Sequence, residues 1–366
     1  MRLGMFMMPL HPPARPMSAM LAEDIEKALL ADRLGFDEFW LGEHFSASSE
    51  PYASAMMFMA SLVPRTTNLK FGTGVINLPN HHPAVVAAEV AQFDHMSGGR
   101  FLFGIGPGGL ASDFELFGAT DFLARGRKMI ESIDMIEKIW SSDPPYELQG
   151  EFWNFGIKNA IVPSLGIGTM PKPLQKPMPP VSITLASPFS GLAKLAEQRG
   201  WDCISANISP VYSVASHWKT YADACAASGK TADGKRWRVV RNILVAPTDR
   251  DAHDRVFGAA ASNRYFFTYM HEIFGGQGLL KLIKPRPEMT DAETTPEALL
   301  EEGVIYGSPK TMLDKLVAFR ERVGPFGTLI MGALDWSGPN EAWERESMRL
   351  LAEDVMPKFR QHIAQH

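Results

Sequence analysis

Two apolar patterns alternate along the chain. Short runs of mostly apolar residues are followed by longer segments in which apolar side chains recur every three or four positions, as at Ile25, Ala28 and Leu29. The short runs are typical of buried strands, and the periodic segments are typical of helices with one buried face. The sequence predicts strands at 2–7, 36–41, 69–76, 100–105, 181–186, 202–206, 238–245 and 327–333.

Each of the eight predicted strands is followed by a predicted helix. Connections of this length are typical of right-handed crossovers between parallel strands. Such a chain closes a barrel or forms an open, doubly wound sheet, and the count of eight favours the barrel. We therefore expect one (β/α)8 TIM-barrel domain over residues 1–366. The expected helices cover 17–34, 52–63, 84–96, 124–140, 189–199, 211–228, 309–323 and 340–362.

Two segments interrupt the alternation. Near 142–180 the prolines are too frequent for a long helix or a central strand, so we expect an insertion or a mobile lid. A second insertion, near 248–300, has a helical pattern in its first half.

Composition and charge narrow the classes of function. Lys and Arg number 36 and Asp and Glu number 41, which gives a formal net charge of −5, and no basic cluster indicates a nucleic-acid partner. No apolar run approaches the roughly 18 residues of a membrane-spanning helix. Cys203 and Cys225 are too few for a disulfide framework, which favours a cytoplasmic location. The 20 Met and 22 Phe supply apolar bulk for a core or for a pocket that excludes water.

A glycine-rich segment, GIGPGG at Gly104–Gly109, follows the fourth predicted strand and formally matches the GxGxxG of dinucleotide-binding folds. Pro107 disfavours that interpretation because it removes a backbone donor inside the loop, and the fingerprint usually follows the first strand. We favour a strand end without Cβ atoms, against which a flat ligand lies. A plain glycine turn is the alternative.

The segment Ser187–Gly191 joins the fifth predicted strand to its helix. Ser187 as N-cap with Pro188 at the first helical position is a strong helix-start pattern. A helix start also exposes N–H groups that bind phosphate, and Ser187 and Ser190 add two hydroxyls. Taken alone, the pattern is more often ordinary capping.

Histidines follow two of the predicted strands. His44 comes after the second strand, where barrel enzymes place catalytic groups, and it can act as a base or a hydrogen-bond donor; a structural role is the alternative. His81 and His82 come after the third strand. They could bind metal, but no HExxH motif or second ligand cluster accompanies them, so we predict no metal.

Together, these segments resemble one family, the bacterial luciferase-like flavin-dependent monooxygenases. The matching stretches extend over nearly the whole chain in the family's order, and the part from 71 to 108 is the most specific. They are LGEHF (41–45), FGTGVINLPNHHP (71–83), AEVAQFDHMSGGRFLFGIGPG (88–108), ASPFSG (186–191), GVIYGSP (303–309) and AEDVMP (352–357).

The resemblance implies FMN at the C-terminal ends of the barrel strands. His44 matches the family's active-site histidine. Thr73, Gly74 and Val75 match the third-strand segment beside the flavin ring, where a non-proline cis peptide is common, so we expect Gly74–Val75 to be cis. The remaining expected cofactor-binding residues are Gly106, Ala186, Ser187 and Ser190.

One position departs from the family pattern. Luciferase itself has a phosphate-binding arginine where this chain has Pro107. The phosphate charge must therefore be met by another cation or by the helix start alone, and Arg125 and Arg127 are the candidate cations. The departure favours a dark oxygenation over light emission.

The resemblance also implies a reaction and its partners. A separate flavin reductase supplies reduced FMN, and the enzyme uses O2 to oxygenate a small apolar substrate. The opening MFMMPLHPP and the HHP turn look most like the limonene and cyclic-ketone oxygenases, which implies a terpene-like or alicyclic substrate, with His11 and His81 on the substrate side. For His11, a plain loop histidine is the alternative. We also expect a homodimer. A deazaflavin-dependent oxidoreductase and a flavin-binding protein without turnover are the alternatives.

Overall fold

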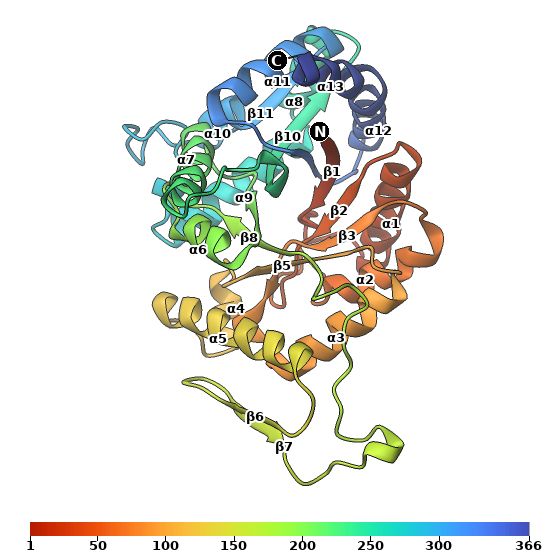
Figure 1. Cartoon of the computed structure of the whole chain (residues 1–366). Coiled ribbons are helices and arrows are strands. Elements are labelled where there is room, and N and C mark those ends of the chain that lie inside the picture. Colours follow the sequence, from red (N-terminus) through yellow and green to blue (C-terminus); the bar gives the residue numbers. More distant parts are fainter. Residues whose placement is uncertain (366) are drawn as a thin grey trace.

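Parallel strands close into a ring in the computed structural model, which describes residues 1–365 (Figure 1). The eight barrel strands of this part of the chain follow one another from β10 through β12, β1, β2, β3, β5 and β8 to β9, and β9 pairs again with β10. The predicted TIM barrel is therefore confirmed. The strands are β1 (Arg2–Met7), β2 (Glu38–Leu41), β3 (Lys70–Thr73), β5 (Phe101–Gly106), β8 (Val181–Leu185), β9 (Asp202–Ser205), β10 (Trp237–Val245) and β12 (Thr328–Ala333).

Helices surround this ring and alternate with its strands along the chain (Figure 1). Their apolar faces pack on the outer faces of the strands in one large core. The helices that follow the barrel strands are α1 (Met17–Arg33), α2 (Ala55–Leu62), α3 (Pro83–Met96), α5 (Phe122–Ser141), α6 (Gly191–Arg199), α7 (Val211–Ala227), α11 (Pro309–Val323), α12 (Asn340–Leu350) and α13 (Met356–Gln365).

Several predicted elements differ in detail from the structure. The strand expected at 69–76 is divided into β3 and β4 (Ile76–Asn77), and the peptide bond Gly74–Val75 between them is cis, as expected. The last helix is interrupted by a π-helical turn at Leu351–Val355. Several short elements were missed because none is long enough to show a period; they include α4 (Ala111–Leu116), β11 (Val304–Gly307), the two hairpin strands of the first insertion and the helix at Pro296–Gly303. Short 3₁₀ turns lie at Val63–Arg65, Leu78–Asn80, Pro163–Leu165, Gly234–Arg236 and Leu280–Leu282.

Trp40 fills the middle of the barrel. Its side chain is 1 % exposed and packs with Leu102, Ile204, Val240 and Ile330, which come from four other strands. A Cβ atom at Gly72 on the neighbouring strand would lie only 2.3 Å from the Trp40 ring. A large side chain on β2 therefore requires glycine on β3.

A buried ion pair crosses the same barrel near the N-terminal ends of its strands. Arg238 of β10 donates from Nε to Glu38 of β2 at 2.7 Å and from Nη2 at 3.1 Å. Both side chains are fully buried, and Asp202 of β9 accepts a third bond from Arg238 at 2.8 Å. The contact joins strands that are far apart in the sequence.

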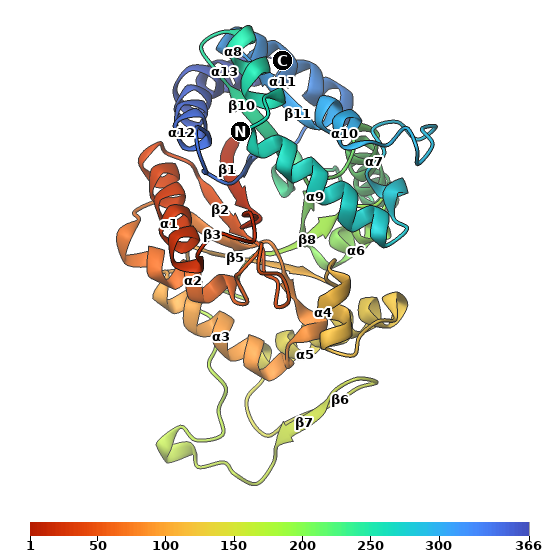
Figure 2. The ribbon, with the colours of Figure 1, turned by 180° about the vertical axis from the view of Figure 1, so that it is seen from behind.

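The two predicted insertions are present and have different positions. The first contains the antiparallel hairpin of β6 (Tyr146–Gln149) and β7 (Asn154–Ile157), and Glu131 of α5 accepts backbone bonds from its turn at Phe152 and Trp153. The second contains α8 (Asp249–Phe257), α9 (Ser262–Gly276) and α10 (Pro296–Gly303). In Figure 2, α9 begins near β1 and runs across the view in front of the barrel strands.

Two tyrosines attach α9 to loops at the C-terminal ends of the first two strands. Tyr265 donates to the carbonyl oxygen of His11 at 3.2 Å, and Tyr269 donates to Glu50 at 2.6 Å. The second insertion is therefore the one that lies over the mouth of the barrel.

Within residues 1–365, none of the helices has both the length and the apolar character that crossing a membrane would require.

Candidate active site

The C-terminal ends of β2, β3 and β5 bring the predicted site residues of the first half of the chain together. Leu41 pairs with Thr73, and after the cis peptide bond Asn77 pairs with Gly106. His44 follows the first of these strand ends. In a TIM barrel this is the end that carries the active site.

His44 lies between two carboxylates. Its Nδ1 is 3.1 Å from Oδ2 of Asp113, and its Nε2 is 3.3 Å from Oε2 of Glu50. Burial alone would lower the pKa of His44, but the hydrogen bond with Asp113 and the negative charge of Glu50 outweigh it, so the pKa is raised. The imidazole is 12 % exposed, and the raised pKa favours its charged form, in which it can donate a proton.

Asp113 also orders the loop that carries His44. Its carboxylate accepts hydrogen bonds from the backbone N–H groups of Phe45 and Ser46, at 3.1 and 2.9 Å, and from the Ser46 hydroxyl. Neither Asp113 nor Glu50 was predicted as a site residue. Asp113 lies on the short helix α4, and only its position four residues after the glycine segment could have suggested it.

Glu43 joins the second strand end to the third. Its Oε1 accepts from the backbone N–H of Asn77 at 3.0 Å and contacts Nε2 of His81 at 2.8 Å. Burial lowers the pKa of His81, but the hydrogen bond with Glu43 outweighs it and the pKa is raised. His81 is therefore held beside the site by Glu43, with 21 % of its side chain exposed.

The third strand end and the glycine segment form a surface with few side chains. The Thr73 hydroxyl donates to the carbonyl oxygen of Gly104 at 2.7 Å. A Cβ atom at Gly106 would lie 2.7 Å from Val75, and one at Gly74 would lie 2.9 Å from Phe6. Close packing against Val75 and Phe6 therefore leaves no room for a side chain at these two positions.

The predicted phosphate segment follows β8, but its helix starts later than expected. Ser190, not Ser187, is the N-cap, because the left-handed backbone of Phe189 (φ 51°) ends the turn before the helix begins at Gly191. The Ser190 side chain makes no capping hydrogen bond, so its hydroxyl and the first N–H groups of α6 lack that partner. Ala186 lies next to this turn, and its carbonyl oxygen accepts from Ser209 at 3.2 Å.

A buried histidine contacts the turn that precedes α6. His217 is 2.9 Å from the carbonyl oxygen of Ser187 through Nε2 and 2.9 Å from the Ser205 hydroxyl through Nδ1. Burial lowers the pKa of His217 to about 4, so its ring is neutral. A neutral ring that donates from Nε2 and accepts at Nδ1 satisfies both contacts.

The two candidate cations on α5 have different surroundings. Arg127 is exposed, and both Nε and Nη2 are bonded to Glu151, at 3.2 and 2.9 Å. Arg125 is 4 % exposed, its Nε and Nη1 have no partner, and its guanidinium lies 3.0 Å from the centre of the Phe114 ring. Burial lowers the pKa of Arg125 to about 10, so it stays charged at neutral pH with donors unused.

His11 does not lie with the other predicted site residues. It is 1 % exposed, with Nδ1 2.7 Å from Asp335 and Nε2 2.9 Å from Asp24. The expected contact with substrate does not fit this position, because both ring nitrogens are occupied. Glu23 and Asp24 could bind a metal together with His11, but Lys27 already contacts both carboxylates, at 2.7 and 3.1 Å.

Comparisons with known proteins agree with this geometry. A family model described as luciferase-like monooxygenase matches residues 1–324. The chain is 31 % identical to 4-hydroxyprotoasukamycin monooxygenase of Streptomyces nodosus subsp. asukaensis, over 97 % of this chain and 91 % of that protein. It is also 31 % identical to limonene 1,2-monooxygenase of Rhodococcus erythropolis, over 97 % and 86 %.

One solved structure is similar over almost its whole length. It is the oxygenating constituent of 3,6-diketocamphane monooxygenase of Pseudomonas putida, a type II Baeyer–Villiger monooxygenase in complex with FMN. Its TM-score to this chain is 0.86 at 26 % sequence identity, and the match covers 98 % of each chain.

Proposed function

Because the chain belongs to the luciferase-like monooxygenase family, we propose that it is an FMN-dependent, two-component monooxygenase that uses His44 to oxygenate a small apolar substrate. The observation that carries the proposal is the position of His44 between Asp113 and Glu50, at the C-terminal ends of the barrel strands and close to the glycine segment.

The residues at the mouth fit FMN. The flat ring would lie at the end of the third strand, beside the cis peptide bond between Gly74 and Val75. Ser187, Ser190 and the start of α6 would hold the phosphate. Arg127 lines the cavity that contains Ser187 and Ser190, but it is already bonded to Glu151. Arg125 has unused donors and is our choice for the missing phosphate cation.

When bound, reduced FMN would supply the electrons that activate O2. The protein's own residues would then do three things. His44 would donate a hydrogen bond or a proton from its imidazolium, Asp113 and Glu50 would keep it charged, and α9 with its two tyrosines would keep water from the mouth.

The names of the relatives support a class of substrate and a partner. Limonene and 2,5-diketocamphane appear in the names of two of the similar enzymes, which supports a terpene-like or alicyclic substrate. One relative, from Acinetobacter baylyi, is named as an oxygenase component, which supports a separate reductase. A homodimer and a cytoplasmic location, where Cys203 and Cys225 would stay unpaired, complete the proposal.

The decisive experiment follows the oxygen atom. The purified chain is loaded with reduced FMN without air, mixed with ¹⁸O₂ and either limonene or 2,5-diketocamphane, and the products are examined by mass spectrometry. One ¹⁸O atom in a product confirms the proposal. Reoxidation of the flavin without labelled product from any alicyclic substrate would favour a flavin-binding protein without turnover.

Cofactor choice is tested separately. The apoprotein is titrated with FMN, reduced FMN and the deazaflavin coenzyme, and binding is followed by absorbance. We expect reduced FMN to bind; tight binding of the deazaflavin alone would reverse the assignment.

A further inference from the structure

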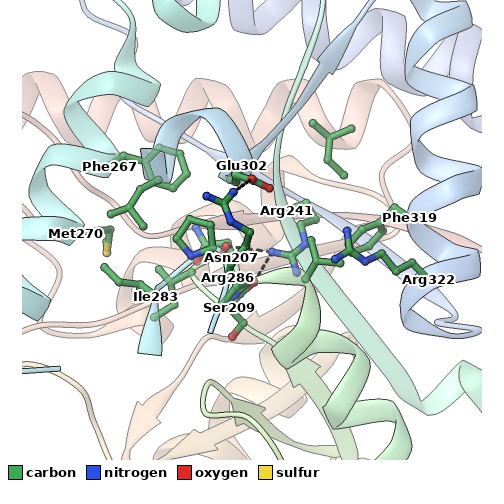
Figure 3. A pocket seen from close by; sticks show the side chains of 17 residues that line it. Asn207, Ser209, Arg241, Phe267, Met270, Ile283, Arg286, Glu302, Phe319 and Arg322 are labelled. Atoms are coloured by element: carbon green, nitrogen blue, oxygen red, sulfur yellow. Dashed lines mark hydrogen bonds and ion pairs between the residues drawn. The ribbon is translucent and has the colours of Figure 1, made fainter. Parts of the chain in front are cut away.

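A cavity of about 280 Å³ is lined in part by the loop between β9 and α7 (Figure 3). This loop, α9, α10 and α11 contribute its walls. None of the residues proposed to bind FMN lines it. Its lining includes both charged and apolar side chains.

Arg241 is the central polar residue of this cavity. It is 4 % exposed and points outward from β10. Its Nη1 donates to the carbonyl oxygens of Ser209 and Asn207, at 2.7 and 3.3 Å. Nε and Nη2 have no partner, and the guanidinium lies 5.0 Å from the centre of the Phe319 ring. A buried guanidinium with two unused donors is costly unless something else binds it.

The charges that line the cavity leave Arg241 without an acidic partner. Glu302 is the acidic residue of the described lining, and it accepts from Arg286 at 2.7 Å. Arg322 adds a third guanidinium at the exposed rim (Figure 3). Burial lowers the pKa of Arg241 to about 9, so it remains charged at neutral pH. Three cations and one anion give the cavity an excess of positive charge.

The remaining walls are apolar. Phe267 and Met270 of α9 lie on one side, and Ile283 and Leu299 continue the surface. These side chains would suit the hydrocarbon part of a ligand but not a fully hydrated ion.

We propose that this cavity binds a small organic carboxylate, with its charged end on Arg241 and its apolar part against Phe267, Met270 and Ile283. Nε and Nη2 lie on one edge of the guanidinium, and a carboxylate binds such an edge through two parallel hydrogen bonds. Because both atoms are enclosed by protein, the guanidinium must shift slightly toward the cavity when the ligand enters. The site is separate from the flavin site and does not depend on oxygenase activity.

The test is calorimetric titration of the full-length protein without flavin. The probes are 3-phenylpropanoate, its neutral amide, and inorganic phosphate. We expect the carboxylate to bind at least about tenfold more tightly than the amide, since they differ in the charge that Arg241 recognises. Saturating FMN should leave this affinity unchanged.

Three variants locate the site. Arg241→Lys keeps the charge but loses the two-donor edge, and we expect affinity for the carboxylate to fall roughly tenfold. Arg322→Met changes an exposed rim residue and should weaken binding a few-fold without affecting folding. Arg250→Met, at an exposed position on α8 outside the cavity, is the matched control and should bind as the original chain does.

Four results would overturn the proposal. They are equal binding of acid and amide, tighter binding of phosphate than of the carboxylate, loss of carboxylate binding when FMN is added, and no effect of Arg322→Met and Arg241→Lys in variants whose melting temperatures are unchanged.

Discussion

At His44, two carboxylates decide which protonation state the site uses. A solvated histidine near pH 7 would be mostly neutral and could act as a base. Asp113 and Glu50 raise its pKa, which favours the charged form and a role as a donor. The sequence alone left two roles open for His44, base and hydrogen-bond donor, and the raised pKa favours the donor.

The first prediction concerns His44→Ala. Product formation from reduced FMN and O2 should fall about 10²-fold or more, the usual scale for losing an acid–base group, while FMN affinity stays nearly the same. His253→Ala, exposed on α8, is the control. Undiminished product formation by His44→Ala would remove this residue from the mechanism.

The second prediction concerns pH. If charged His44 is the active form, activity is present at low pH and is lost as the pH rises through the raised pKa. Asp113→Asn removes a carboxylate that raises this pKa, so the loss should occur at lower pH. Rates of product formation measured from about pH 5 to about pH 10, a range that extends above the ordinary histidine pKa, give the shift in the midpoint of this loss. Ser46→Ala removes one hydroxyl that donates to Asp113 but keeps the carboxylate, so the midpoint of the pH profile should stay in place.

The third prediction distinguishes the two arginines of α5. Arg125→Met should weaken FMN binding roughly 10- to 100-fold, the scale of a lost charged hydrogen bond, and Arg127→Met should change it little because Arg127 already binds Glu151. Fluorescence titration with FMN measures both. Equal losses in the two variants, or a loss with Arg127→Met alone, would contradict the choice of Arg125.

At the scale of elements, the strands of the barrel are matched in side-chain size. Trp40 of β2 occupies the interior beside Gly72 of β3, so β3 must present no side chain at that level. Two residues later, just after β3, Gly74 leaves room for Phe6. Packing inside the barrel therefore explains glycines that a strand would otherwise disfavour.

The fourth prediction tests this packing. Gly72→Ala would place its Cβ 2.3 Å from the Trp40 ring, and we expect a loss of about 1–3 kcal/mol in the free energy of unfolding, measured with urea. Gly126→Ala, in α5 with no neighbour within 4 Å of its added Cβ, should instead gain roughly 0.5–1 kcal/mol. The same sign in both variants would contradict the packing argument.

At the scale of the whole molecule, closure of the barrel brings Glu38 and Arg238 together. The residues are 200 positions apart, and the bonds between them connect the first half of the barrel to the second. Burial would raise the pKa of Glu38, but the charge of Arg238 outweighs it and the pKa is lowered. The stabilisation from Glu38 is therefore present above its unfolded pKa, about 4.3, and is lost as the pH falls through its lower folded pKa.

The fifth prediction concerns this ion pair. Glu38→Gln leaves Arg238 buried with only Asp202 as its acidic partner, so stability at pH 7 should fall by about 3–5 kcal/mol. Glu341→Gln, which removes an exposed pair with Arg345, should cost under about 0.5 kcal/mol. Thermal and urea unfolding measure both variants, and similar small losses would show that the buried pair adds little.

The sequence by itself determined the barrel, the order of its elements and the strand ends that form the mouth. These features depend on the spacing of apolar residues and on glycine and proline at the ends of elements, and both are local properties of consecutive residues. His44 and the turn at Ser187–Ser190 could be proposed as site residues for the same reason, since each directly follows a strand.

Only the tertiary structure decided which residues become partners. Asp113 comes to His44 from 69 positions away, and Asp335 comes to His11 from 324, where it helps to bury a residue expected to face substrate. The unused donors of Arg125 and Arg241 likewise became visible only once their neighbours were known. The charge, burial and pKa of each site residue depend on all the loops that meet at one end of the barrel. The spacing of residues along the chain does not show which loops those are.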